Sequence, residues 1–329
     1  MLLDLPALAA KVDPGLVDIN TQLSHPNVQA AGTGIVLDSS GVVLTNNHVI
    51  SGADNINVTD IGNGQTYPAT VLGYDRVHDI AVLQMQGASG LPTATIGNSG
   101  TVAIGDHVAA IGNAGGRGGT PSIAAGTVSA LDQMVTVSDE ITGSVERLAG
   151  LIEIAADIQP GDSGGPLVDT AGEVVGVDTA GATGSPTAPS GGAGLAIPIN
   201  DAVAIGKQIR AGSSSATVHI GATGVLGVLV QGTGATARPG RHAWLGYRHR
   251  PAAPGVVVTD VVAGSPAEQA GLAAGSVLVS LDGTAVDSSD TLITALYAHH
   301  PGDSVQVVWA DPSSDRHSST VTLAPGPPN

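Results

Sequence analysis

Short apolar segments separated by turn residues run from residue 32 to residue 200, and this alternation limits the fold most strongly. The segments are rich in Val and Ile, have the length of strands, and are bounded by Gly, Asp, Ser or Pro; they include GTGIVLD, SSGVVLT, IAVLQM, HVAAIGN and GLAIPIN. The first two are joined by a hairpin turn at residues 38–41. Closely spaced strands with many turns are typical of an all-β barrel or sandwich. The sequence therefore predicts a mostly β protein.

The strand pattern stops at residues 201–212, DAVAIGKQIRAG. Asp201 can cap a helix, apolar residues recur at three- and four-residue spacing, and Gly212 can end it. Because 329 residues allow about two domains, we expect a first domain over 1–212, a linker at 213–217 and a second domain over 218–329. For the second domain we predict strands near 225–230, 255–262, 276–282, 304–310 and 318–323, helices at 265–271 and 288–299, and an insertion near 232–255.

The charge of the chain is strongly acidic, with 28 Asp and Glu against 11 Lys and Arg and a net charge of −17. A nucleic-acid partner would need a basic face, so this balance argues against one. The one basic cluster lies in the predicted insertion, where we interpret it as a solvated loop; it consists of Arg238, Arg241, His242, Arg248, His249 and Arg250.

Membrane and export signals are absent from the sequence pattern. No apolar run approaches about 18 residues, so we expect no membrane span. The first residues, MLLDLPALAAKV, lack a basic start followed by an apolar stretch, so we expect any leader of an exported form to be missing from this sequence. The chain has no cysteine, which leaves its redox compartment open.

The segment QPGDSGGPL at 159–167 suggests a catalytic serine. Acyl transfer to a hydroxyl needs a nucleophile, a base and donors for the oxyanion. Glycines on both sides of Ser163 permit a tight turn that exposes its hydroxyl and directs backbone amides at one point. The alternative is an ordinary turn with an incidental serine, but four constrained residues around one Ser favour catalysis.

A base and its partner are expected upstream of Ser163. LTNNHVISGA ends a strand with His48, and VHDIAVLQM places Asp79 at the start of another. The order His48, Asp79, Ser163 is that of chymotrypsin-type enzymes. His78 is a rival base, but strand neighbours point to opposite faces, so only one of residues 78 and 79 can face His48. We assign that position to Asp79.

The segments TNNHVI, HDIAVL, GDSGGPLV and GLAIPIN together resemble the marker segments of the HtrA/Deg serine proteases, and most of all the secreted actinobacterial PepA-like members. The C-terminal segment GVVVTDVVAGSPAEQAGLAAGSVLVSLDGTAV is similar to the core of a PDZ domain. The resemblance covers nearly the whole chain from about residue 12. It implies a chymotrypsin-like double β-barrel followed by a PDZ domain of the α+β class.

The resemblance also implies an activity and its residues. His48 would be the general base, Asp79 its orienting partner and Ser163 the nucleophile, with an oxyanion hole built from the amides of Gly161, Asp162 and Ser163. It implies unfolded or misfolded proteins as substrates, C-terminal peptides at the PDZ domain, a homotrimer, and a secreted or cell-envelope location. The alternative function is a chaperone or protein-binding module with a latent protease site.

One departure from the family pattern concerns substrate preference. Family members usually read Asp-Ala-Ala-Ile before the active-site loop, whereas this chain reads AADI at 155–158. The acid is thereby moved to Asp157, six residues before Ser163, a position that forms the floor of the specificity pocket in chymotrypsin-like folds. Asp157 would then select Arg or Lys. In the alternative, Asp157 pairs elsewhere and the pocket takes small or medium aliphatic side chains.

Two segments fit the carboxylate-binding loop of a PDZ domain, which adds a peptide as a strand and holds its carboxylate with loop amides. The preferred segment contains Val225, Leu226, Gly227 and Val228, because it follows the linker; the second is AWLGYRH at 243–249. An ordinary strand with one glycine remains the alternative for either. The ten histidines show no zinc-ligand spacing, and GNAGGRGGT lacks the Lys-Ser/Thr of a phosphate loop, so the sequence predicts no metal and no cofactor.

Overall fold

The computed structural model describes residues 4–23, 28–138, 145–179, 194–230 and 255–328. The chain divides into two compact units between Gly221 and Ala222, and each is described by itself. The predicted insertion at 232–255 lies outside the described residues except for Gly255.

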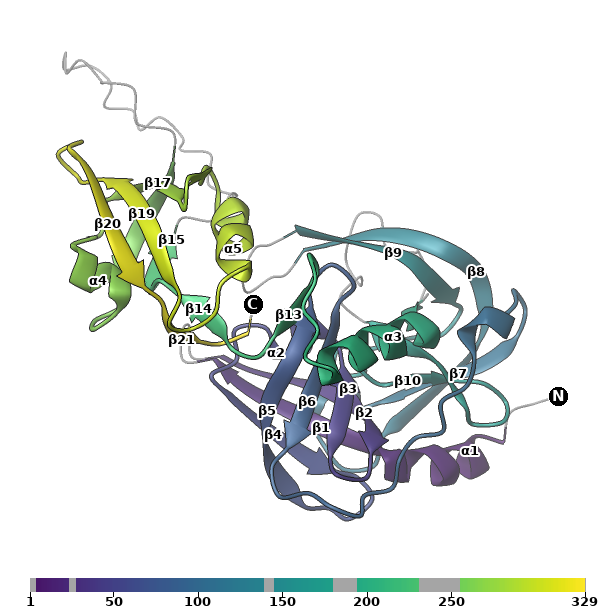
Figure 1. The fold of residues 1–329 in the computed structure, drawn as a ribbon. Helices are drawn as coiled ribbons and strands as arrows, with labels where there is room; N and C mark the ends of the chain where they lie inside the picture. Colours follow the sequence, from purple (N-terminus) through teal and green to yellow (C-terminus); the bar gives the residue numbers. More distant parts are fainter. Residues whose placement is uncertain (1–3, 24–27, 139–144, 180–193, 231–254, 329) are drawn as a thin grey trace. The chain divides into compact units, whose positions relative to one another are not determined.

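The first unit begins with a closed barrel, coloured purple to blue in Figure 1. Its sheet has the order β5-β4-β1-β2-β3-β6, and an additional β5–β6 pairing closes the ring. The hairpin turn predicted at 38–41 joins β2 to β3, where Gly41 donates to the Asp38 carbonyl at 2.9 Å and has a φ of 88°. The strands are β1 (Leu16–Leu23), β2 (Val28–Asp38), β3 (Val42–Thr45), β4 (Asn55–Asp60), β5 (Thr66–Asp75) and β6 (Ile80–Met85).

A second closed barrel follows with the order β10-β11-β12-β9-β8-β7. Its strands are β7 (His107–Gly112), β8 (Ser122–Ser138), β9 (Val145–Ile154), β10 (Pro166–Val168), β11 (Val174–Thr179) and β12 (Gly194–Pro198). The predicted double β-barrel is thus confirmed. A further strand, β13 (Val218–Ile220), pairs with β5 of the first barrel. These three residues, which the sequence analysis assigned to the second domain, belong to the first unit because of that pairing.

Helices join and cover the barrels. α3 (Ile199–Arg210) matches the helix expected at 201–212 and packs against β5, β6 and β11. Helix α1 (Leu5–Val12), which the sequence analysis did not predict, is capped by Asp4, whose side chain accepts from the Ala7 amide. α2 (Asn47–Ile50) is a short helix. Three 3-10 turns complete the unit: η1 (Asp13–Gly15), η2 (Ser99–Thr101) and η3 (Ala114–Gly116).

One hydrophobic cluster runs through both barrels. It joins Ile35, Leu44 and Ile80 of the first barrel to Ile111 and Val177 of the second, and all five are completely buried. Burying such side chains stabilises a fold by about 1.5–3 kcal/mol each. The shared core therefore fixes the loops of one barrel against those of the other.

The second unit has a central sheet of order β15-β16-β17-β19-β20, with β18 on β17. Its strands are β14 (Thr223–Val225), β15 (Val228–Val230), β16 (Val256–Val261), β17 (Val277–Leu281), β18 (Thr284–Ala285), β19 (Ser304–Ala310), β20 (Arg316–Thr322) and β21 (Ala324–Gly326). Its helices are α4 (Pro266–Ala270) and α5 (Ser289–Tyr297), each with a serine N-cap. These elements agree with the predicted helices and with the other predicted strands, but the strand expected near 225–230 is divided into β14 and β15 by the turn at Leu226 and Gly227, and β21 was not predicted. Across the described ranges, no helix is long and apolar enough to cross a membrane.

Candidate active site

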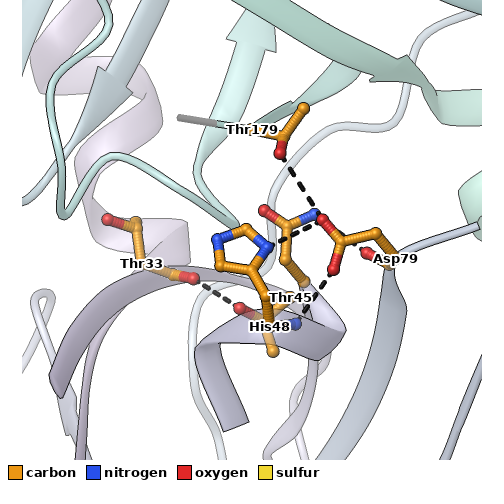
Figure 2. Close-up of polar contacts among 6 residues, drawn as sticks. Thr33, Thr45, His48, Asp79 and Thr179 are labelled. Carbon is orange, nitrogen blue, oxygen red and sulfur yellow. Dashed lines mark hydrogen bonds and ion pairs between the residues drawn. The ribbon is translucent and has the colours of Figure 1, made fainter. Parts of the chain in front are cut away.

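His48 and Asp79 form the centre of the site, as Figure 2 shows. Nδ1 of His48 lies 2.8 Å from Oδ2 of Asp79, and the His48 amide donates to Oδ1 of the same carboxylate at 2.9 Å. The carboxylate is buried, whereas the His48 side chain is 29% exposed. A proton held on Nδ1 by this carboxylate makes Nε2 the basic nitrogen, on the side of the ring away from Asp79.

The backbone at Asp79 is unusual, and it directs the carboxylate. Asp79 has a φ of 54°, a left-handed conformation that is uncommon for a residue other than glycine. Asn46 stabilises it by donating to the Asp79 carbonyl at 2.9 Å, and Thr179 of β11 lies 3.5 Å from Oδ2. Because neighbouring side chains hold the strained residue, the carboxylate is preorganised toward His48.

Two details of the sequence analysis are corrected here. His48 lies in helix α2, not at a strand end, because β3 ends at Thr45. Residues 78 and 79 lie in the turn between β5 and β6, so the strand-face argument against His78 does not apply. His78 has its own carboxylate partner, because its Nδ1 lies 2.8 Å from Oδ2 of Asp75.

The loop that carries Ser163 is anchored by backbone bonds on both sides. The Thr33 amide donates to the Ser163 carbonyl at 2.8 Å, and the Gly164 amide donates to the Asp178 carbonyl at 2.9 Å. Thr33 also donates through Oγ1 to the Gly161 carbonyl at 2.8 Å. Ser163 itself is buried. The loop is thereby held between β2 of one barrel and β11 of the other.

Only glycine fits at the two bends of this loop. Gly161 has a φ of 102°, and a Cβ there would lie 2.2 Å from the Asn113 carbonyl oxygen. Gly164 has a φ of 84°, and its Cβ would lie 2.1 Å from the Thr33 carbonyl oxygen. Both distances are far below van der Waals contact, so the glycines of GDSGGP are required by packing as well as by backbone conformation.

β2 also connects the serine loop to the histidine helix. A Cβ on Gly32 would lie 2.7 Å from the Val49 side chain and 3.1 Å from the Ser163 carbonyl oxygen. Thr45, three residues before His48, donates to the Thr33 carbonyl at 2.7 Å. Helix α2 and the Ser163 loop therefore both pack on residues 32 and 33 of β2.

Of the three amides assigned to the oxyanion hole, one has another acceptor. The Asp162 amide donates to the Gln159 carbonyl at 3.0 Å. Among the described residues, the Gly161 amide has no acceptor. The Gly161 amide is thus a candidate donor from this loop, and the roles of the Asp162 and Ser163 amides in the oxyanion hole stay predictions.

The two acids near the loop differ in environment. Asp157 is exposed, although Ala156 and Ile158 on either side are buried. The assignment of Asp157 to the floor of the specificity pocket stays a prediction. Asp162 is buried, and its carboxylate accepts from the Gln159 amide at 2.9 Å and from Ser122 Oγ at 3.3 Å. Burial raises the pKa of Asp162.

In the second unit, the segment 225–228 forms a tight loop between β14 and β15. Leu226 is buried in the core, and its carbonyl accepts from the Ala267 amide at 2.9 Å. Gly227 has a φ of 82° and lies against Ser265. Among the described strands, β15 lies at the edge of its sheet and pairs only with β16, and an edge of this kind can accept an added strand. The competing segment at 243–249 lies outside the described residues.

Metal ligands do not gather in the described part of the chain: no group of three or more His, Asp or Glu side chains there could hold an ion.

Family models match both units. A trypsin-like peptidase domain matches residues 32–177 and a PDZ domain matches residues 234–309. The serine protease PepD of Mycobacterium tuberculosis is 35% identical over 96% of this chain and 65% of its own length. The serine protease Do-like HtrA of Lactococcus lactis is 32% identical over 86% of this chain and 68% of its own. The chain spans between half and about two thirds of the length of the first curated relatives.

Solved structures agree with these relatives. The HtrA-type protease AlgW with a tripeptide superimposes with a TM-score of 0.52 and 28% sequence identity, covering 98% of each chain.

Proposed function

Because the chain belongs to the HtrA family of serine proteases, we propose that it is a serine endopeptidase with Ser163 as its nucleophile. The observation that carries the proposal is the bond from His48 Nδ1 to the buried Asp79 carboxylate. The helix that carries His48 and the glycine-bounded loop that carries Ser163 both pack on strand β2. This arrangement supplies the base, the orienting acid and the nucleophile of acyl transfer.

In the proposed reaction, Nε2 of His48 accepts the Ser163 hydroxyl proton as Oγ attacks the peptide carbonyl. Asp79 keeps the Nδ1 proton in place and stabilises the imidazolium that forms. The amides of Gly161 and Ser163 stabilise the oxyanion. The imidazolium then protonates the leaving amine, and a water molecule, deprotonated by His48, hydrolyses the acyl-enzyme.

For substrates and partners we propose unfolded or misfolded proteins, with the loop 225–228 and the edge of β15 binding their C-terminal residues. Family resemblance supports a homotrimer, which light scattering would test. It also supports a secreted or cell-envelope location, in line with the name of a relative from Chlamydia trachomatis that describes it as periplasmic.

The test is cleavage of casein by the wild-type protein and by Ser163→Ala, with and without C-terminal peptides. The loss of the nucleophile should lower turnover on the order of 10⁶-fold. Labelling of Ser163 by a fluorophosphonate probe gives a second readout. Absence of cleavage and labelling in every condition, with a folded wild-type protein, would contradict the proposal and favour a binding module.

A further inference from the structure

Asp178 is a buried acid beside the Ser163 loop, and it has no role in the proposed reaction. It lies on β11, directly before Thr179, and is fully buried. The backbone of Asp178 makes two hydrogen bonds to the loop: the Gly164 amide donates to the Asp178 carbonyl at 2.9 Å, and the Asp178 amide donates to the Gly165 carbonyl at 2.8 Å. The position of residue 178 is therefore tied to the two residues that follow Ser163.

The carboxyl group of Asp178 is poorly compensated: among the described residues, only the backbone amide of Ile111 lowers its pKa. Neither Oδ1 nor Oδ2 has a hydrogen-bond partner among the described residues. β7 contributes only the Ile111 amide nearby, and β12 places Ala196 opposite Asp178. A buried carboxylate without a donor or counter-ion is costly, and such a group normally takes up a proton instead.

Among the described residues, the one charged group that acts on Asp178 has the same sign. It is Asp162, the residue before the nucleophile. Asp162 packs closely on β7, where a Cβ on Gly112 would lie 2.8 Å from its Oδ1, and its carboxylate is held by the Gln159 amide and Ser122 Oγ. The only charge acting on Asp162 from farther out is the exposed Asp157, again an acid. No described cation acts on this acidic pair. Burial, followed by repulsion from Asp162, raises the pKa of Asp178 well above its usual range.

We propose that Asp178 is a positioning residue that holds the Ser163 loop only as a neutral, protonated acid, so that loss of this proton at alkaline pH releases the loop and stops acyl transfer. The inference rests on the proposed function for its effect on activity. Its effect on folding stability is independent of that function.

The sign of the pH dependence follows from linkage. An acid that holds its proton more tightly in the folded state stabilises the fold at low pH, and this contribution is lost as pH rises through the folded pKa. His48 has the opposite effect on activity, because its imidazole can accept the Ser163 proton only when it is not already protonated. Activity should therefore increase and then fall with pH, and the alkaline fall should depend on residue 178.

The experiment compares Asp178→Asn with the wild-type protein, because an amide has nearly the same shape and cannot ionise. Urea denaturation from pH 6 to pH 10, in a Ser163→Ala background to prevent self-cleavage, gives stability. Fluorophosphonate labelling over the same range, in proteins that retain Ser163, gives the state of the loop. Asp201→Asn, at an exposed acid in α3, is the matched control.

We expect the wild-type protein to lose stability relative to Asp178→Asn as pH rises from 6. The alkaline limb of labelling should move up by at least about one pH unit in Asp178→Asn and stay in place in Asp201→Asn. If Asp178→Asn does not fold, Asp162→Asn provides the second test. Removing that charge makes the ionisation of Asp178 less costly and lowers its pKa, so the alkaline limb should move to lower pH in this variant, opposite to its shift in Asp178→Asn.

Parallel stability curves for the two proteins, or an unmoved alkaline limb, would overturn the inference. Failure of the proposed function looks different: no cleavage or labelling at any pH, while the denaturation curves still separate.

Discussion

Nδ1 of His78 lies 2.8 Å from Oδ2 of Asp75, the same separation that joins His48 to Asp79. Asp75 is buried and also accepts the amides of Val77 and His78 through Oδ1. It thereby fixes the turn whose last residue, Asp79, faces His48. The two histidine–carboxylate pairs are separate, and the His78 side chain is half exposed.

Substitution of the two histidines should separate their roles. His48→Ala should lower kcat for casein by about 10⁴- to 10⁶-fold, because the base is lost. His78→Ala should change kcat by less than about tenfold, because its bond only supports a turn that Asp75 also holds. Equal losses in both variants, measured with folded proteins, would show that the assignment of the base is incomplete.

Asp18 should make stability depend on pH in the weakly acidic range. It is buried in β1, and burial, partly opposed by the Gly119 amide, raises its pKa to about 6. The stabilisation is present below about pH 4 and is lost as pH rises through about 6. Asp18→Asn should therefore be more stable than the wild-type background at pH 8, by up to about 3 kcal/mol.

Urea denaturation at pH 4 and pH 8 measures this effect, in the Ser163→Ala background. The two proteins should differ least at pH 4. A constant difference across the range would mean that the charge of Asp18 does not carry the effect.

Asp157 provides a test of substrate preference. Because its side chain is exposed, Asp157→Ala should leave the ratio of cleavage after Arg to cleavage after Val within about twofold. A panel of peptides that differ only in the residue before the scissile bond measures this ratio. A selective tenfold loss after Arg would instead show that Asp157 reads basic side chains, as the sequence pattern first suggested.

Gly227 should be required for binding of C-terminal peptides. Gly227→Ala introduces a Cβ 2.2 Å from the Ser265 Cβ at a φ of 82°, so the loop must move. We expect peptide affinity to fall at least about tenfold, a cost of about 1.4 kcal/mol. Isothermal titration with a C-terminal peptide measures this change.

Gly283→Ala is the matched control. It has a similar φ of 79°, but a Cβ there would have nothing within 4 Å. Both variants carry backbone strain, and only Gly227→Ala should lose peptide affinity. Equal losses would point to general destabilisation of the unit, and equal retention would place the peptide elsewhere.

The sequence by itself determined the mostly β class, because strand length and turn residues are local patterns. Its resemblance to the HtrA/Deg proteases, carried by segments such as GDSGGP, implied the double barrel and the PDZ domain. It also put His48, Asp79 and Ser163 in an order typical of the fold. The hairpin at 38–41 and the helices α3, α4 and α5 followed from local signals such as capping residues and glycines. Such signals depend on neighbours a few residues away, so they can be recognised in the sequence without the tertiary structure.

Only the tertiary structure decided how those residues are used. It gave His78 its own carboxylate, directed the Asp162 amide to Gln159 and left Asp157 in solvent. It also buried Asp18 and Asp178, which look like ordinary strand acids in the sequence. The physical reason is that burial and pairing depend on strands brought together from distant parts of the chain: the same carboxyl group is ionised in water and holds a proton in a closed barrel.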